Sequence, residues 1–339
     1  SPWLNSEITH IAKELNTAIQ ARPAIANKTK IMITEAAQWD HIYNTSGGAS
    51  ARQGQLDTFF NPANTATYIG DLPAMQPKMI GGHTYYTHAS DANLRSHRTQ
   101  LKAKADSLGV EVYSTEWCLL TGGEGLSDPA TANYYDIALY MAKLCHSDIT
   151  IGGISSWAYW TAMDMEMTGR DRYTLIGLSP GSPNAYDINS YQSHNIRESG
   201  SIKSMPTLWA LGNYSLFVRP GFKRIGITNV DNDETGNNNI TKLMATAYKS
   251  PDGYTDKDGK AVDRIVAVYV NMTTTPAETA AIFTDNKLPV RIRCFRTDAA
   301  NTGADNGGGL GMRSEGHNQG VIVVPPRSIY TVVYDFPVE

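Results

Sequence analysis

Residues 1–203 repeat one pattern, an amphipathic helix followed by a short apolar strand, and this alternation constrains the fold more than any other feature. Apolar residues at helical spacing mark each expected helix, and short runs of branched residues mark each strand. The expected strands are 30–35, 78–83, 110–116 and 151–160. Strands joined by helices lie parallel with right-handed crossovers, so the sequence predicts a parallel α/β region.

The four expected strands all end in polar or aromatic side chains. Glu116 shares the parity of Val110, Val112 and Ser114, so a carboxylate continues a face of small and branched residues. A charge in phase with buried positions is costly unless a site uses it. The other polar or aromatic residues at these ends are Glu35, His83, Tyr85, Trp157 and Trp160. Because the carboxyl ends of parallel strands form the active face of α/β proteins, these residues predict a functional site.

A different pattern begins after a helix expected at 205–217. From residue 222 onward, alternating apolar and polar residues form runs separated by Gly and Pro, which is typical of an antiparallel β-sandwich. The runs are 242–255, 264–275, 290–301 and 320–336. The sequence therefore predicts two domains, 1–205 and 206–339.

Composition argues against several classes of function. The formal net charge of −4 does not suit binding of nucleic acid or of an anionic membrane, and no apolar run is long enough to span a bilayer. Three scattered cysteines and eight dispersed histidines lack the spacing of a disulfide framework or a metal site, so neither metal nor cofactor is expected. The loop 229–239 has the Asp-x-Asp spacing of a calcium loop without its later ligands, so a hairpin turn is expected there. The 18 tyrosines instead suit a neutral ligand with flat faces.

Three stretches carry a resemblance to a known family. STEWC spans 114–118, GGHTYY spans 81–86, and LWALGNYSLFVRPGFKRI spans 208–225. They resemble, in turn, the nucleophile strand, the His-x-Tyr strand and the link into the β-sandwich of glycoside hydrolase family 30, which contains β-glucosylceramidases, glucuronoxylanases and β-1,6-galactanases. GISSWAYW at 153–160 falls where the family has its eighth strand. A closed (β/α)8 barrel needs eight strands, so the resemblance implies the C-terminal half of a TIM barrel followed by an antiparallel β-sandwich.

The resemblance also implies an activity and its residues. Glu116 is expected to be the nucleophile of a retaining β-glycosidase, which holds the sugar as a covalent ester during double displacement. Bacterial exported galactanase-like members are the most similar, so an exported enzyme acting on an oligo- or polysaccharide, such as β-1,6-galactan, is expected. Parity places Trp157 and Tyr159 on one face and Trp160 on the other. The expected substrate-binding residues are His83, Tyr85, Trp160, Trp157, Glu35 and Trp39.

The chain holds only half of the expected catalytic pair. Retaining glycosidases need a second carboxylic acid about 5–5.5 Å from the nucleophile, and the family carries it in an Asn-Glu-Pro motif. This sequence lacks that motif, and residues 1–20 match the helix that follows it, so the acid/base Glu is expected upstream of residue 1. Glu35 stays open as an alternative acid. Glu124 and Glu166 lie in expected loops, where a solvated carboxylate is the ordinary case.

Two other interpretations stay open. A protein that kept the aromatic cleft and lost the acid would bind carbohydrate without cleaving it. An intact open sheet of four strands is a further possibility, although its two free edges would favour aggregation. The glycosidase, by contrast, needs the N-terminal barrel half as its partner.

Overall fold

The structure, a computed structural model, divides into two compact units. The first contains Ser1–Ser127 and Ser147–Trp160, and the second contains Asp128–His146 and Thr161–Glu339. Residues 128–146 and 161–205, which the sequence placed in the first domain, group with the second unit. The residues that the structure describes are 3–45, 50–120, 126, 132–165, 173–180, 200–227, 240–281, 283, 287–302, 311–315 and 321–338. Glu124, Glu166 and the calcium-like loop 229–239 lie outside the described residues.

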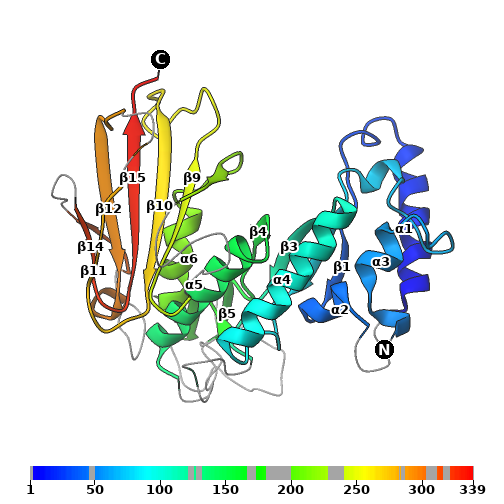
Figure 1. The fold of residues 1–339 in the computed structure, drawn as a ribbon, viewed down its shortest axis with the longest axis horizontal. Helices are drawn as coiled ribbons and strands as arrows, with labels where there is room; N and C mark the ends of the chain where they lie inside the picture. Colours follow the sequence, from blue (N-terminus) through cyan, green and yellow to red (C-terminus); the bar gives the residue numbers. More distant parts are fainter. Residues whose placement is uncertain are drawn as a thin grey trace. The chain divides into compact units, whose positions relative to one another are not determined.

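A parallel sheet of four strands forms the centre of the first unit, in the order β1-β2-β3-β4 (Figure 1). The strands are β1 (Ile33–Ala36), β2 (Met79–His83), β3 (Glu111–Glu116) and β4 (Ser156–Trp157). The predicted parallel arrangement is confirmed, but the strand expected at 151–160 is only two residues long. Along β3, Val112 and Ser114 are buried and Glu116 is partly exposed, as the parity of the sequence predicts.

Helices connect these strands. They are α1 (Asn5–Gln20), α2 (Trp39–Tyr43), α3 (Gln55–Phe60), α4 (Asp91–Leu108) and the last turn of α5 (Tyr134–Thr150), with short 3₁₀ helices η1 (Ser50–Arg52) and η2 (Pro73–Met75). The sequence predicts that Ser90 or Asp91 caps α4 and that Gly109 ends it. In the structure the Ser90 hydroxyl accepts the backbone N–H of Asn93, and Gly109 ends the helix at φ 63°. In Figure 1, α4 runs alongside β3.

The sequence predicts that Asn5 can cap the first helix and that Ile8, Ile11, Ala12, Leu15 and Ile19 form its apolar face, and the structure differs in two ways. Asn5 is the first helical residue and not the cap, and its side-chain amide donates to the carbonyl oxygen of Gln53. Ile11 and Leu15, expected to point inward, are exposed, whereas Ala12 and Ile19 are buried. One face of α1 is therefore apolar and uncovered by the described residues.

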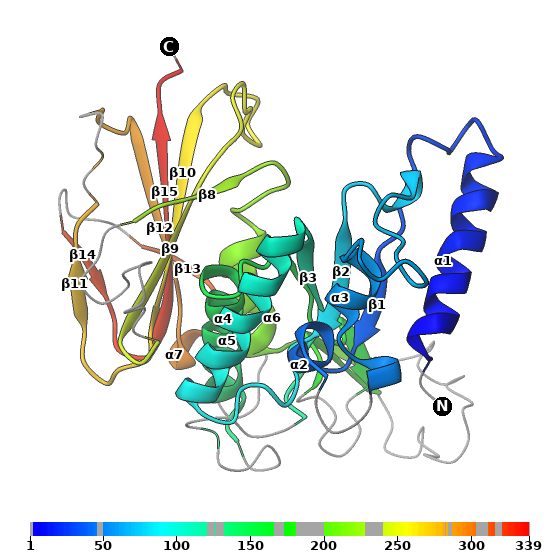
Figure 2. The same ribbon diagram turned by 45° about the vertical axis from the view of Figure 1, so that its right-hand side comes forward.

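The second unit is dominated by an antiparallel sheet of six strands, in the order β13-β12-β15-β10-β9-β8 (Figures 1 and 2). Its strands are β8 (Lys223–Ile225), β9 (Leu243–Lys249), β10 (Asp263–Asn271), β12 (Arg291–Thr297), β13 (Arg313–Glu315) and β15 (Ser328–Phe336). Four of them, β9, β10, β12 and β15, coincide with the four alternating runs of the sequence, with β10 starting one residue before its run. This confirms that the alternation marks strands.

Smaller elements complete the second unit. One small sheet pairs β11 (Ala277–Thr279) with β14 (Ile322–Val324), and another joins β5 (Met163–Met165), β6 (Ile176–Pro180) and β7 (Gly200–Ser204). The helices are the first turns of α5, then α6 (Pro206–Ser215) and α7 (Ala299–Thr302). The helix predicted at 205–217 is therefore confirmed as α6.

A cluster of arginines and aspartates ties the strands of the six-stranded sheet together. Asp335 on β15 accepts hydrogen bonds from Arg264 Nε (2.6 Å), Arg291 Nε (2.8 Å) and Arg293 Nη2 (3.2 Å). Arg291 also donates to Asp256, whose other oxygen accepts the backbone N–H of Lys260 at 3.0 Å. Two buried carboxylates are thus stabilised in their ionised form.

Acid is expected to weaken this unit. Burial opposes ionisation of Asp335, but the hydrogen bonds from Arg264 and Arg291 outweigh it and lower its pKa. The Lys260 N–H and then Arg291 lower the pKa of Asp256 to about 2. Groups with lowered folded-state pKa stabilise the fold above the ordinary carboxyl pKa of about 3.9 and lose this contribution as the pH falls.

Calorimetry between pH 5 and 2 checks this expectation. The transition of the second unit should move to lower temperature on acidification, with the steepest change below about pH 4. The Asp256→Asn variant should show a shallower dependence, because an amide does not titrate. Equal pH dependence in the two proteins would show that Asp256 is not part of the effect.

Candidate active site

The carboxyl ends of β1, β2 and β3 bring the predicted residues together. His83, the last residue of β2, lies opposite Glu116, the last residue of β3, at a register shift after Gly82. The glycines of the GGH motif allow this close approach. A Cβ on Gly82 would lie 2.5 Å from Ile42 Cδ1, and one on Gly81 would lie 3.1 Å from Glu35 Oε1. Larger side chains at these positions would displace the side chains of Ile42 and Glu35.

Glu116 is bordered by two polar side chains, one from the end of β2 and one from the segment that follows it. The Tyr85 hydroxyl donates to Glu116 Oε1 at 3.1 Å, and His83 Nδ1 lies 3.7 Å from the same oxygen. The carboxylate side chain is 29% exposed, so one side of it stays accessible. The arrangement orients one oxygen of a carboxylate toward the protein and leaves the group available for chemistry.

The Tyr85 hydroxyl is held as a hydrogen-bond donor. Burial, assisted by the adjacent Cys118 and Glu116, raises the pKa of Tyr85 far above its ordinary value. The backbone N–H of Cys118 donates to the Tyr85 oxygen at 3.1 Å and fixes its position. Burial also raises the pKa of the Cys118 thiol to about 12. At neutral pH both groups are therefore protonated and uncharged.

Glu35 is the second carboxylate of the cluster. Its Oε2 accepts hydrogen bonds from His83 Nε2 (2.9 Å) and from the Thr115 hydroxyl (2.8 Å). The hydrogen bond from His83 is the main cause of its lowered pKa, which burial opposes and Thr115 reinforces. The backbone of Glu35 has φ 106°, a conformation that residues other than Gly rarely adopt. Strained residues of this kind cluster at functional sites.

The aromatic candidates separate into exposed and buried residues. Trp160 is 45% exposed, so part of its side chain is accessible to a ligand. Trp157 and Tyr159 both pack against the buried Trp117, with ring centroids 6.2 and 6.0 Å away. Trp39 is fully buried and donates to the Thr84 hydroxyl at 3.0 Å. This placement corrects the expectation for Trp39, which has no exposed face for a platform.

A buried ion pair, which the sequence reasoning missed, contacts Trp157 and the segment that follows β2. Arg98 Nε on α4 lies 2.8 Å from Asp148 Oδ1 on the last turn of α5, and both side chains are fully buried. Asp148 also accepts the indole N–H of Trp157 at 2.8 Å and the Thr84 hydroxyl at 3.4 Å. Burial raises the pKa of Asp148, while Arg98 and the indole N–H act in the opposite direction. The pair therefore fixes Trp157 and the segment that follows His83.

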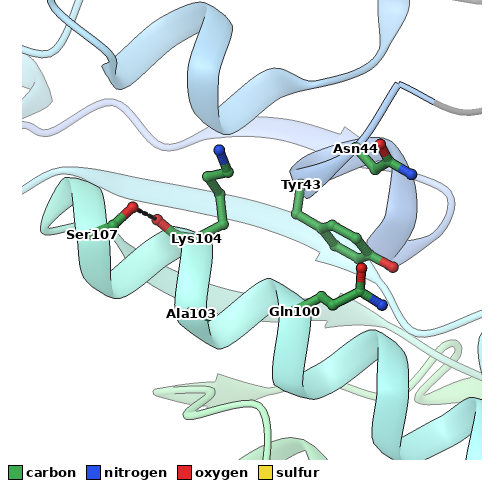
Figure 3. Close-up of a pocket in the computed structure, with 6 residues that line it drawn as sticks. All are labelled: Tyr43, Asn44, Gln100, Ala103, Lys104 and Ser107. Carbon is green, nitrogen blue, oxygen red and sulfur yellow. Dashed lines mark hydrogen bonds between the residues drawn. The ribbon is translucent and has the colours of Figure 1, made fainter.

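Two of the depressions in the first unit are lined by described residues. One, of about 420 Å³, lies between the end of α2 and α4 and is lined by Tyr43, Asn44, Gln100, Ala103, Lys104 and Ser107 (Figure 3). It has no carboxylate in its lining and so lacks the groups for glycoside chemistry. The other, of about 830 Å³, runs between α1 and β1 and is lined by apolar residues such as Ile11, Leu15 and Met32, with Glu35 at one end. It lies on the side of β1 that has no neighbouring strand among the described residues.

Comparison with known proteins agrees with the resemblance read from the sequence. The model of O-glycosyl hydrolase family 30 matches residues 1–168. A conserved exported protein from Bacteroides fragilis is similar over 98% of this chain and 60% of its own, with a TM-score of 0.74 and 21% identity. A GH30 endoxylanase from Clostridium papyrosolvens C71 (TM-score 0.55, 18% identity) covers 98% of this chain and 61% of its own. The catalytic domain of GH30 xylanase C from Talaromyces cellulolyticus (TM-score 0.57, 15% identity) is similar over 98% of this chain and 57% of its own.

These likenesses establish the fold, and the chain spans about 60% of the length of the first solved structures it matches. Among the described residues, no helix is long and apolar enough to cross a membrane.

Proposed function

We propose, from the match of residues 1–168 to the model of O-glycosyl hydrolase family 30, that the chain is part of a retaining β-glycosidase with Glu116 as its nucleophile. The observation that carries this proposal is the convergence of the Tyr85 hydroxyl and the His83 ring on one oxygen of Glu116. This geometry leaves the second oxygen free to attack. A partly exposed, oriented carboxylate at the carboxyl end of a parallel strand is what double displacement requires.

The reaction proceeds in two balanced steps. In the first, Glu116 attacks the anomeric carbon, the glycosidic C–O bond breaks, and an acid gives its proton to the departing oxygen. In the second step, the residue that acted as the acid now acts as a base. It takes a proton from water, and the water oxygen displaces Glu116 from the ester. Tyr85 donates a hydrogen bond to Glu116 while Glu116 is a carboxylate. This hydrogen bond weakens when the ester forms, because the negative charge on the oxygen is lost.

The acid/base residue belongs, in this proposal, to a part of the enzyme outside residues 1–339. The partial span of the matched structures supports this, as does the free side of β1. The apolar groove along β1 offers a surface on which further barrel strands and helices pack, and its residues include Ile11, Leu15 and Met32. On this view residues 1–205 are the second half of a (β/α)8 barrel and residues 206–339 form a β-sandwich.

The substrate proposed is a neutral, β-linked oligo- or polysaccharide. The partly exposed Trp160 supports stacking on the C–H face of a sugar, and neither arginine nor lysine contacts Glu116 among the described residues. The sequence resemblance favours β-1,6-galactan, while two matched structures are named xylanases. The exported neighbour supports an exported enzyme.

Trapping of the glycosyl-enzyme tests the proposal. The whole enzyme is incubated with 2-deoxy-2-fluoro-β-glycosides of galactose, glucose and xylose carrying a good leaving group, and its peptides are analysed by mass spectrometry. We expect one sugar adduct, on the peptide containing Glu116, and no adduct in Glu116→Gln. Product release from β-1,6-galactan, β-xylan and β-glucosides then ranks the substrates.

The outcomes distinguish the enzyme from a binding protein. Binding of a glycan by isothermal titration, with neither adduct nor product from the whole enzyme, would support the non-catalytic alternative. An adduct on another carboxylate would reassign the nucleophile.

A further inference from the structure

His83 lies between two carboxylates that come from different strands. Its Nε2 is 2.9 Å from Glu35 Oε2 on β1, and its Nδ1 is 3.7 Å from Glu116 Oε1 on β3. A neutral imidazole carries one N–H, and a ring nitrogen at hydrogen-bond distance from a carboxylate is the nitrogen that carries it. The shorter contact therefore selects Nε2 as the protonated nitrogen and turns Nδ1 toward Glu116.

Glu35 is itself held in place for this contact. The Thr115 hydroxyl donates to the same oxygen that His83 contacts, and Gly81 on the intervening strand leaves room for the other oxygen. The backbone of Glu35 keeps φ 106°, which a residue with a Cβ adopts only when surrounding structure compels it. The contacts and the strained backbone are separate observations, and both fix the direction of this side chain.

We propose that Glu35 is a positioning residue that acts through His83, fixing its Nε2–H tautomer and ring plane so that Nδ1 faces the nucleophile Glu116. This inference rests on the proposed function for the role of Glu116. When Glu116 is in the ester, Glu35 still accepts the hydrogen bond from Nε2–H and keeps the ring in place. When the ester breaks, the returning carboxylate meets a ring that is already oriented.

The same contacts argue against the alternative that Glu35 is the acid. A general acid must carry a proton, whereas one oxygen of Glu35 already accepts two hydrogen bonds and its pKa is lowered. Residues that orient a functional imidazole through its second nitrogen fix its tautomer in this way in other enzymes. Glu35 thus has the chemistry of an acceptor.

Nitrogen NMR of the whole enzyme, labelled with ¹⁵N in histidine, tests the tautomer directly. His83→Gln identifies the signals of His83. At a pH where the ring is neutral we expect the Nε2–H form in wild type and in Glu116→Gln, a mixture of tautomers in Glu35→Ala, and recovery of the Nε2–H form in Glu35→Gln, because Gln keeps an acceptor oxygen. Glu111→Gln, which removes a carboxylate at the opposite end of β3, is the matched control and should leave the signals unchanged.

Kinetics give the second readout. Glu35→Ala should lower kcat by about 10–100-fold, as loss of a supporting carboxylate commonly does, with KM little changed and with partial recovery in Glu35→Gln. A predominantly Nδ1–H ring in wild type, or an unaltered tautomer in Glu35→Ala, overturns the proposal. So does recovery of the Glu35→Ala activity by azide on substrates with good leaving groups, which would identify an acid/base. The NMR result needs no turnover, so an enzyme that cleaves nothing would contradict the proposed function and still leave the Glu35–His83 contact testable.

Discussion

Glu116→Gln is expected to abolish hydrolysis while leaving the fold intact. The amide has the size of the carboxylate and can accept the Tyr85 hydroxyl, but it cannot form the glycosyl ester. Removal of a covalent nucleophile should lower kcat/KM by roughly 10⁴-fold or more. Because the Glu116 side chain is partly exposed, the free energy of unfolding should change by no more than about 0.5 kcal/mol.

The measurement is kcat/KM of the whole enzyme on an aryl β-glycoside and on the preferred polymer, together with the thermal unfolding temperature. Glu111→Gln is the control, because Glu111 lies at the exposed start of the same strand and its side chain accepts the Tyr113 hydroxyl, far from the site. It should keep wild-type activity. Activity of Glu116→Gln within tenfold of wild type would show that another group is the nucleophile. Equal glycan binding by wild type and variant, with no turnover by either, would favour the binding protein.

The sequence was sufficient to predict the centre of this site. Strand parity places Val112 and Ser114 in the interior and Glu116 at the strand end, and the structure has them there. The helix–strand alternation also predicts that β2 and β3 are parallel neighbours, which brings His83 opposite Glu116. Such features depend on local periodicity and on topology, which short sequence patterns encode.

The contact between Glu35 and His83 could not be predicted in the same way. It joins residues 48 positions apart and depends on a backbone φ of 106° at Glu35, which no propensity of Glu indicates. The position of the Trp39 ring could not be predicted from the sequence either. An aromatic residue after a strand end suits a platform, but a five-residue helix turns its ring inward onto Thr84.

The buried ion pair did leave a signal in the sequence. Arg98 is four residues after Leu94, and Asp148 is four residues after Leu144, so each charge falls on the apolar stripe of its helix. Opposite charges in such positions on two helices predict a buried pair, because a single buried charge would be too costly. The apolar members of the two stripes do not indicate the pair by themselves.

Asp148→Asn is expected to destabilise the first unit by about 3–5 kcal/mol, the usual cost of leaving one partner of a buried ion pair unpaired. Asn has nearly the shape of Asp, so the loss reports the charge left on Arg98 and not a cavity. Tryptophan fluorescence during urea unfolding suits the measurement. The first unit holds Trp3, Trp39, Trp117, Trp157 and Trp160, five of the six tryptophans, and the second holds Trp209.

Two further variants make the Asp148 result interpretable. Lys104→Gln breaks the exposed pair with Asp57 and should cost no more than about 1 kcal/mol, as surface pairs do. The double variant Arg98→Met with Asp148→Leu removes both charges, so it should be more stable than Asp148→Asn, because apolar side chains of similar volume can replace a buried pair. A loss in Asp148→Asn no larger than that in Lys104→Gln would mean that Arg98 finds compensation elsewhere. If the expected loss is found, the orientation of Trp157 beside Trp117 depends on a charge pair that never contacts the substrate, and activity should fall together with stability.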